Sequence, residues 1–126
     1  MISVPKRIMV VDDNPAIRRA LKNILEFNHD WIVCGEAVDG REGIEKAQQL
    51  HPDLIVLDVS MPVMNGLDAA RVLHQIMPTV PLILCSLHTD DVLRKEATHA
   101  GVDAVISKAQ NMQSLVFKAR ELLGTL

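Results

Sequence analysis

Acidic, hydroxyl and amino side chains stand where four short apolar runs of the sequence end. Asp12 and Asp13 follow the first run, Asp58 the second, Ser86 the third and Lys108 the fourth. Carboxylates bind divalent cations through oxygen, and a carboxylate can also attack phosphorus to form an aspartyl phosphate. A hydroxyl and an ammonium group would stabilise the negative charge of the transferring group. The residue types therefore predict magnesium-assisted phosphoryl transfer.

The three aspartates have distinct predicted roles. Like charges in one pocket raise each other's pKa, whereas a bound divalent cation keeps all of them ionised, so Mg²⁺ is the predicted cofactor. Asp58 is the predicted nucleophile, and a carboxylate needs no general base for this attack. Taken singly, Asp13 could be a turn or cap residue and Lys108 a solvated surface residue. The agreement of all the strand ends favours a joint site.

These side chains must be positioned by the elements that precede them. Short apolar runs alternate with amphipathic stretches throughout the 126 residues, which is typical of a doubly wound α/β domain with a parallel sheet. The carboxyl ends of parallel strands share one edge, so the candidate residues are expected to converge there. Strands are predicted at Arg7–Val11, Trp31–Ala37, Leu54–Asp58, Pro81–Ser86 and Ala104–Ser107. Helices are predicted at about 15–27, after Asp39, after Gly66, at about 90–100 and at about 112–123.

Composition narrows the class of protein. The length suits one domain, taken as residues 1–126, and the formal net charge of -3 gives no general attraction to nucleic acid. No run approaches the roughly 20 apolar residues of a membrane span, and Met1–Arg7 lacks the apolar core of a signal peptide. Cys34 and Cys85 lie in apolar segments, where a free thiol acts as a small buried hydrophobe. A soluble, cytoplasmic protein is expected.

The motifs resemble those of one known family over nearly the whole sequence. Residues 10–14 read Val-Val-Asp-Asp-Asn, residues 57–66 read Leu-Asp-Val-Ser-Met-Pro-Val-Met-Asn-Gly, and Ser86 and Lys108 follow. The chain is thus similar to the CheY-like receiver domain of two-component response regulators. The stretch at residues 34–40, Cys-Gly-Glu-Ala-Val-Asp-Gly, resembles NarL/FixJ/LuxR-type regulators, which usually carry a helix-turn-helix output domain. The resemblance implies a five-stranded parallel sheet of order 2-1-3-4-5.

The resemblance also implies roles for individual residues. Asp58 would accept a phosphoryl group from the phosphohistidine of a sensor kinase. Asp13, Asp58 and the backbone carbonyl of Ser60 would hold Mg²⁺ directly, with Asp12 acting through a metal-bound water.

By the same resemblance, Ser86 and Lys108 would carry the conformational response to phosphorylation. Ser86 would move toward the phosphate and Lys108 would pair with it, which would repack the surface of the fourth helix, fifth strand and fifth helix. That surface or the last helix could form a homodimer, in which the hypothesis places Phe117. A DNA-binding output domain would be a further partner, absent from this chain.

Three alternatives stay open. Val105 stands where the family often has a switching aromatic residue, and Leu87 replaces a common small residue, so a phosphorylation-independent pseudo-receiver is the main alternative. A haloacid dehalogenase-like phosphatase would need a second aspartate at position 60, where this chain has Ser60. A flavin-binding module is disfavoured by the acidic pocket and by the scarcity of aromatic residues, with one Trp, two Phe and no Tyr.

Overall fold

The computed structural model describes residues 4–109 and 112–124, so both ends of the predicted 1–126 domain lie outside the described residues. Every predicted strand and helix is present, with shifts of one or two residues at some ends. Strand β4 begins after Pro81, because proline has no N–H to donate to a ladder. The strands are β1 (Lys6–Val11), β2 (Trp31–Ala37), β3 (Leu54–Asp58), β4 (Leu82–Ser86) and β5 (Ala104–Ser107). The helices are α1 (Pro15–Glu26), α2 (Gly40–Leu50), α3 (Gly66–Ile76), α4 (Asp91–His99) and α5 (Gln113–Leu123).

The strands form one parallel sheet in the order β2-β1-β3-β4-β5, which confirms the predicted flavodoxin/CheY-like topology. The chain moves outward from β1 to β2, then crosses back and continues from β3 toward β5. The reversal lies between β1 and β3, which pair from Ile8–Leu54 to Val11–Leu57. In open α/β sheets this reversal opens a crevice outside the carboxyl ends of the two strands. The topology therefore places Asp12 and Asp58 beside the expected ligand position.

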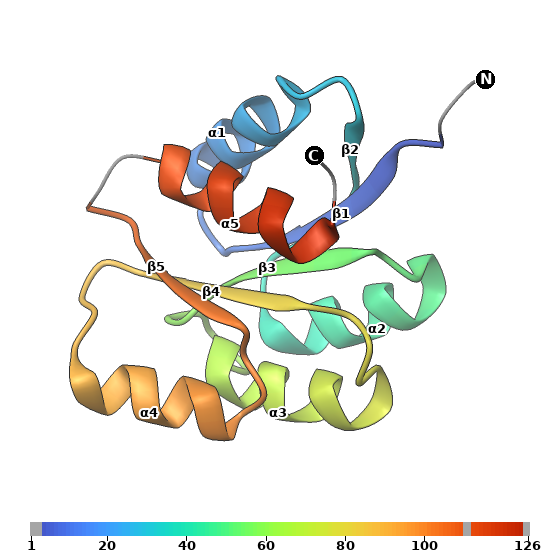
Figure 1. Ribbon diagram of the computed structural model, residues 1–126. Coiled ribbons are helices and arrows are strands. Elements are labelled where there is room, and N and C mark those ends of the chain that lie inside the picture. Colours follow the sequence, from blue (N-terminus) through green and yellow to red (C-terminus); the bar gives the residue numbers. More distant parts are fainter. Residues whose placement is uncertain (1–3, 110–111, 125–126) are drawn as a thin grey trace.

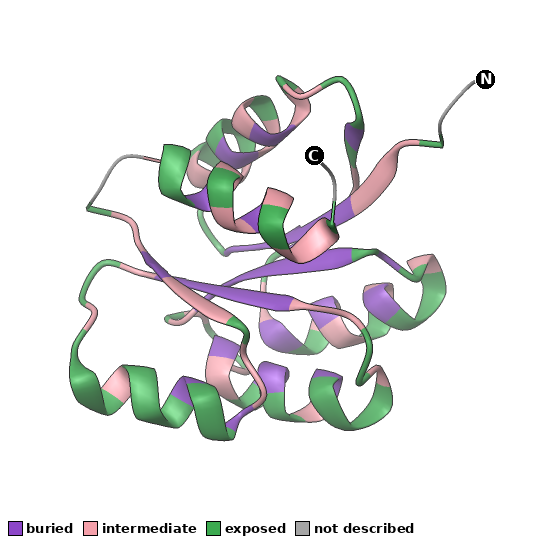
Figure 2. Ribbon diagram, in the orientation of Figure 1, coloured by how far each residue is buried: buried purple, intermediate pink, exposed green. Residues whose placement is uncertain are grey.

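Helices cover both faces of the sheet (Figure 1). α1 and α5 lie on one face, while α2, α3 and α4 lie on the other. Each face has its own apolar core, with Leu25 and Leu115 buried on the first and Leu73 and Ala97 on the second. Figure 2 shows the central strands buried and the outer sides of the helices exposed. Within the described residues, no helix combines the length and the apolar character that crossing a membrane would require.

The start of α1 is fixed immediately after the acidic residues of β1. Asn14 is extended and its side-chain Oδ1 accepts hydrogen bonds from the N–H groups of Ala16 (2.9 Å) and Ile17 (3.2 Å). Pro15 takes the first helical position, where no N–H is needed. Asn14 therefore caps α1, and this cap limits the loop between β1 and α1 to Asp12–Asn14.

Candidate functional site

The loop after β1 and the last residue of β3 bring three aspartates together. One carboxylate oxygen from each of Asp12, Asp13 and Asp58 lies within 4.8 Å of the others. Asp12 and Asp58 are buried, with 1% and 8% of their surface exposed, whereas Asp13 is exposed. Buried carboxylates need compensating partners, since removing an ionised group from water is unfavourable. The site therefore combines two desolvated carboxylates with one at the solvent boundary.

Lys108, which follows the edge strand β5, is one of the partners that stabilise the two buried carboxylates. Its backbone N–H donates to the Ser86 carbonyl (2.8 Å), which aligns the end of β5 with β4. The ammonium Nζ lies 2.8 Å from Asp12 Oδ2 and 2.8 Å from Asp58 Oδ1. Burial alone would lower the pKa of Lys108, but its bonds to the two carboxylates outweigh burial and raise that pKa. Lys108 is thus held as a cation between the two buried acids.

The pocket disfavours the ionised form of Asp58. Burial raises its pKa, and the charges of Asp12 and Asp13 add to the rise, while the hydrogen bond from Lys108 opposes it. A further cation in the pocket would act in the same direction as Lys108. The electrostatics of the site therefore favour the binding of positive charge beside Asp58.

The loop from β3 to α3 closes the pocket on the other side. A Cβ added to Gly66 would lie 2.1 Å from the Asp58 carbonyl oxygen, so only glycine allows this approach of α3 to β3. The Gly66 N–H donates to the Val59 carbonyl (2.9 Å), and Ser60 lines the same cavity as the aspartates. Val63 has a φ of 68°, a conformation that is unfavourable for a β-branched residue by about 1–3 kcal/mol. Tight packing, rather than local preference, sets the shape of this loop.

Ser86 lies in the pocket but is engaged with its own loop. Its hydroxyl donates to the His88 carbonyl (2.8 Å) and accepts from the His88 N–H (3.2 Å). Leu87 and His88 line the same cavity, whose volume is about 350 Å³. Leu87, which replaces the small residue common in the family, thus lies at the cavity, with 64% of its surface exposed. Val105 lies elsewhere, in a hollow that it shares with residues of α4 and α5.

Two contacts at the acidic loop were not predicted from the sequence. The Asn14 N–H donates to Asp12 Oδ1 (2.9 Å), and Arg18 Nη1 donates to the Asp12 carbonyl oxygen (2.7 Å). Arg18 Nε also lies 3.2 Å from Glu36 Oε1. In the sequence, these contacts are indicated only by a basic residue in α1 and an acidic residue in β2. The pairing of β1 with β2 is needed to show that these two residues meet.

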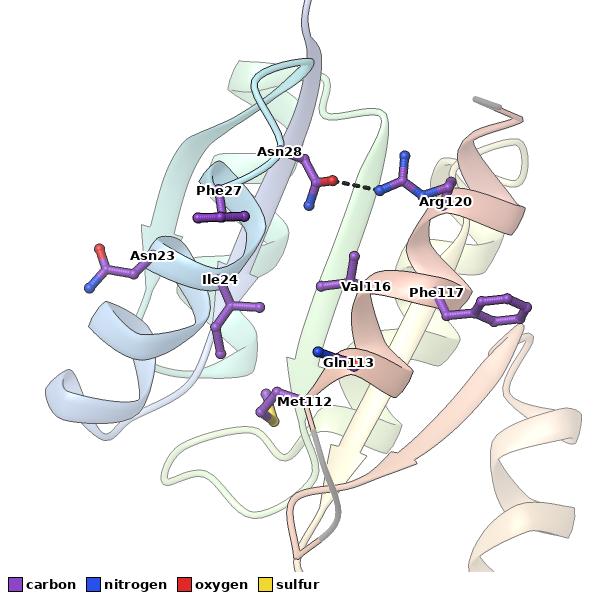
Figure 3. Close-up of a pocket in the computed structure, with 9 residues that line it drawn as sticks. All are labelled: Asn23, Ile24, Phe27, Asn28, Met112, Gln113, Val116, Phe117 and Arg120. Carbon is purple, nitrogen blue, oxygen red and sulfur yellow. Dashed lines mark hydrogen bonds between the residues drawn. The ribbon is translucent and has the colours of Figure 1, made fainter.

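A second hollow lies between α1 and α5 and has a different character (Figure 3). Its volume is about 580 Å³, larger than that of the acidic cavity. Ile24, Met112 and Val116 contribute apolar surface, and Asn28 Oδ1 accepts a hydrogen bond from Arg120 Nη2 (2.5 Å). Among the described residues that line it, Arg120 alone is charged. Size therefore does not identify the reactive site, because the described residues that line this hollow include neither a nucleophile nor a set of metal ligands.

Comparison with known proteins matches the acidic site and the fold to one family. The family model for the response regulator receiver domain matches residues 8–120, which include the three aspartates, Ser86 and Lys108. The chain belongs to the response regulator receiver family. It is 39% identical over 103 residues to the chemotaxis protein CheY of Thermotoga maritima, covering 82% of this chain and 85% of that protein.

Other relatives of this receiver domain are longer proteins. It is 41% identical over 113 residues to a protein-glutamate methylesterase/protein-glutamine glutaminase of Caldanaerobacter subterraneus subsp. tengcongensis, covering 89% of this chain and 31% of that protein. The chain spans only 23% to 35% of the length of the methylesterases that it matches. The match therefore covers only part of each such protein.

Solved structures agree with this assignment. The response regulator domain of Thermotoga maritima CheB superposes with a TM-score of 0.89 at 31% identity, covering 97% of this chain and 98% of that chain. A LuxR-family response regulator from Aurantimonas sp. SI85-9A1 superposes with a TM-score of 0.91 at 26% identity, covering 95% and 86% of the two chains. The receiver fold is thus shared with regulators of different outputs.

Proposed function

We propose that this receiver domain accepts a phosphoryl group on Asp58 from the phosphohistidine of a sensor histidine kinase. The observation that carries the proposal is the Asp58 carboxylate beside Lys108 Nζ and two further aspartates at the sheet reversal. A carboxylate oxygen of Asp58 attacks phosphorus, the phosphorus–nitrogen bond breaks, and its electron pair returns to the imidazole of the donor. Lys108 stabilises the charge on the phosphoryl oxygens during this transfer.

The acidic residues fit a magnesium ion. Three carboxylate oxygens within 4.8 Å of one another form the kind of hard donor set that Mg²⁺ prefers. Asp13, Asp58 and the Ser60 carbonyl would hold the ion directly, and Asp12, which already binds Lys108, would act through a metal-bound water. When bound, the ion supplies positive charge that offsets both the clustered carboxylates and the phosphoryl oxygens.

The phosphoryl group would change the receiver through Ser86. Its hydroxyl must release the His88 carbonyl in order to donate to a phosphoryl oxygen. About 1.5 to 2 negative charges added at Asp58 would favour that rearrangement and the pairing with Lys108. The surface of α4, β5 and α5 would then adopt the packing that its partner binds, since a switch acts only through differential stabilisation of two states.

The proposed partners follow from this switch. They are a sensor histidine kinase in the cytoplasm and a DNA-binding output domain, with residues 1–126 as the receiver part of a transcriptional regulator. The Cys34–Gly40 stretch and the LuxR-family structural neighbour support that output. The relative CheY, a chemotaxis protein, supports chemotaxis as the competing assignment.

Homodimer formation through the α4-β5-α5 face or through α5 belongs to the same proposal. Phe117 on α5 is 70% exposed, and Val105 lies between α4 and α5. Phe117→Ser is expected to weaken self-association of the phosphorylated protein in analytical ultracentrifugation. Ile32→Ser, a change at an exposed apolar residue of β2, the edge strand opposite β5, serves as the control. An association constant unchanged by Phe117→Ser would remove Phe117 from the interface.

Incubation with acetyl phosphate and Mg²⁺, followed by intact mass spectrometry, tests the central proposal. A single phosphoryl adduct is expected on the wild-type chain and none on Asp58→Asn. Omission of Mg²⁺ should suppress the adduct. A wild-type chain that stays unmodified would instead support the phosphorylation-independent pseudo-receiver.

A further inference from the structure

Arg18 differs from an ordinary surface arginine of α1. Its side chain is only 17% exposed, whereas the adjacent Arg19 is exposed. Nη1 donates to the Asp12 carbonyl oxygen (2.7 Å), and Nε lies 3.2 Å from Glu36 Oε1. The rigid guanidinium fork thus reaches two partners, a backbone carbonyl in the loop after β1 and a carboxylate on β2.

The carbonyl that Arg18 contacts belongs to the peptide between the two acidic residues of the loop. The N–H of Asp12 is already fixed, because it donates to the Ala37 carbonyl of β2 (3.0 Å). Arg18 holds the carbonyl group of the same residue. The Asp12–Asp13 peptide can then turn little, and its orientation sets the direction of both side chains.

Glu36 is itself held in place. Lys46 Nζ from α2 donates to the Glu36 carbonyl oxygen (2.6 Å), while the Glu36 carboxylate faces Arg18. A series of contacts therefore runs from α2 through the end of β2 and the start of α1 to the acidic loop. A partly exposed ion pair such as Arg18–Glu36 contributes little to the stability of the fold, about 0–1 kcal/mol. Stabilisation of the fold therefore does not account for this arrangement.

We propose that Arg18, anchored by Glu36, is a positioning residue that orients the Asp12–Asp13 peptide for binding of a divalent cation. The inference rests on the proposed function, because Mg²⁺ binding is what the orientation serves. Mg²⁺ tolerates little departure from octahedral geometry. Loss of groups that orient metal ligands typically weakens metal binding about 10- to 100-fold. Arg18→Met should therefore raise the half-saturating Mg²⁺ concentration by about that factor.

The test compares four proteins, namely the wild type, Arg18→Met, Glu36→Gln and the exposed matched control Arg19→Met. Mg²⁺ binding is measured by isothermal titration calorimetry, and acetyl phosphate labelling is followed as a function of Mg²⁺ concentration. The Arg18→Met and Glu36→Gln proteins should need more Mg²⁺ for half-maximal labelling, yet approach the wild-type rate at saturating Mg²⁺. Arg19→Met should match the wild type in both measurements.

A merely structural role would give a different result. Arg18→Met would then lower the melting temperature without moving the half-saturating Mg²⁺ concentration, and this outcome overturns the inference. If Arg18→Met does not fold, Glu36→Gln decides by the same criterion. If the wild type binds Mg²⁺ but forms no phosphoryl adduct, the proposed function is wrong and the role of Arg18 in Mg²⁺ binding still stands. If the wild type binds no Mg²⁺, both proposals are wrong.

Discussion

The carboxyl edge of the sheet and the apolar body beneath it are continuous in sequence but opposite in character. Leu57 is fully buried among apolar side chains, and the next residue, Asp58, ends the strand in a pocket of charges. In the body, each large side chain removed from water contributes about 1.5–3 kcal/mol. At the edge, burial of carboxylates is unfavourable and is offset by Lys108. One residue step therefore separates the part that stabilises the fold from the part that does chemistry.

This difference shows how the fold can support a reactive site. In the body, β1 and β3 are each paired with a strand on both sides, so their carboxyl ends are held beside each other in a fixed register. The edge can then keep Asp58 in an environment that raises its pKa without loss of the fold. Changes in the body should act on stability, and changes at the edge should act on charge and phosphorylation.

The largest expected effect on stability comes from Leu57→Ala. The side chain is 0% exposed, so its truncation leaves a cavity and should lower the free energy of unfolding by about 2–5 kcal/mol. Urea denaturation followed by circular dichroism measures this change. Leu87→Ala, at a residue 64% exposed, is the matched control and should alter stability by less than about 0.5 kcal/mol. Equal effects of the two variants would contradict the division between body and edge.

Removal of the cation at the edge comes next. Lys108→Met leaves Asp12 and Asp58 buried without their shared partner, and we expect a loss of roughly 3 kcal/mol, the lower end for a broken buried pair, since the pocket opens to solvent. Mg²⁺ should restore part of this stability in the variant by supplying positive charge to the same acids. Thermal denaturation with and without Mg²⁺ measures both. Equal gains on adding Mg²⁺ to variant and wild type would argue against a shared electrostatic role.

The fold was largely predictable from the sequence because its signals are local. Apolar runs of four to seven residues mark the strands, and Asn14 followed by Pro15 marks the start of α1. The meeting of Asp12 and Asp58 was also predictable, since parallel strands share a carboxyl edge. These inferences need only residue types and their order along the chain.

Contacts between elements were not predictable to the same extent. The bond from Arg18 to the Asp12 carbonyl depends on the direction in which α1 leaves the sheet, and its anchor Glu36 depends on the pairing of β1 with β2. The bond between Ser86 and His88 depends on the loop conformation after β4. The left-handed conformation of Val63 runs against its β-branched side chain, so the residue type alone does not predict it.

The smallest and most discriminating effect is expected for Asp58→Asn, which should abolish the phosphoryl adduct and yet stabilise the fold at neutral pH without Mg²⁺. Burial raises the pKa of Asp58 in the folded state, so the folded chain binds more protons than the unfolded chain between the two pKa values. The stability contributed by this group therefore falls as the pH rises through that interval, and the unfavourable contribution is complete above the folded pKa. Asparagine does not titrate. The difference in unfolding free energy between variant and wild type should thus be small in acid, grow as the pH rises and then stay constant, as measured by urea denaturation across pH. A less stable variant at neutral pH would show that the bond from Lys108 outweighs the desolvation of Asp58.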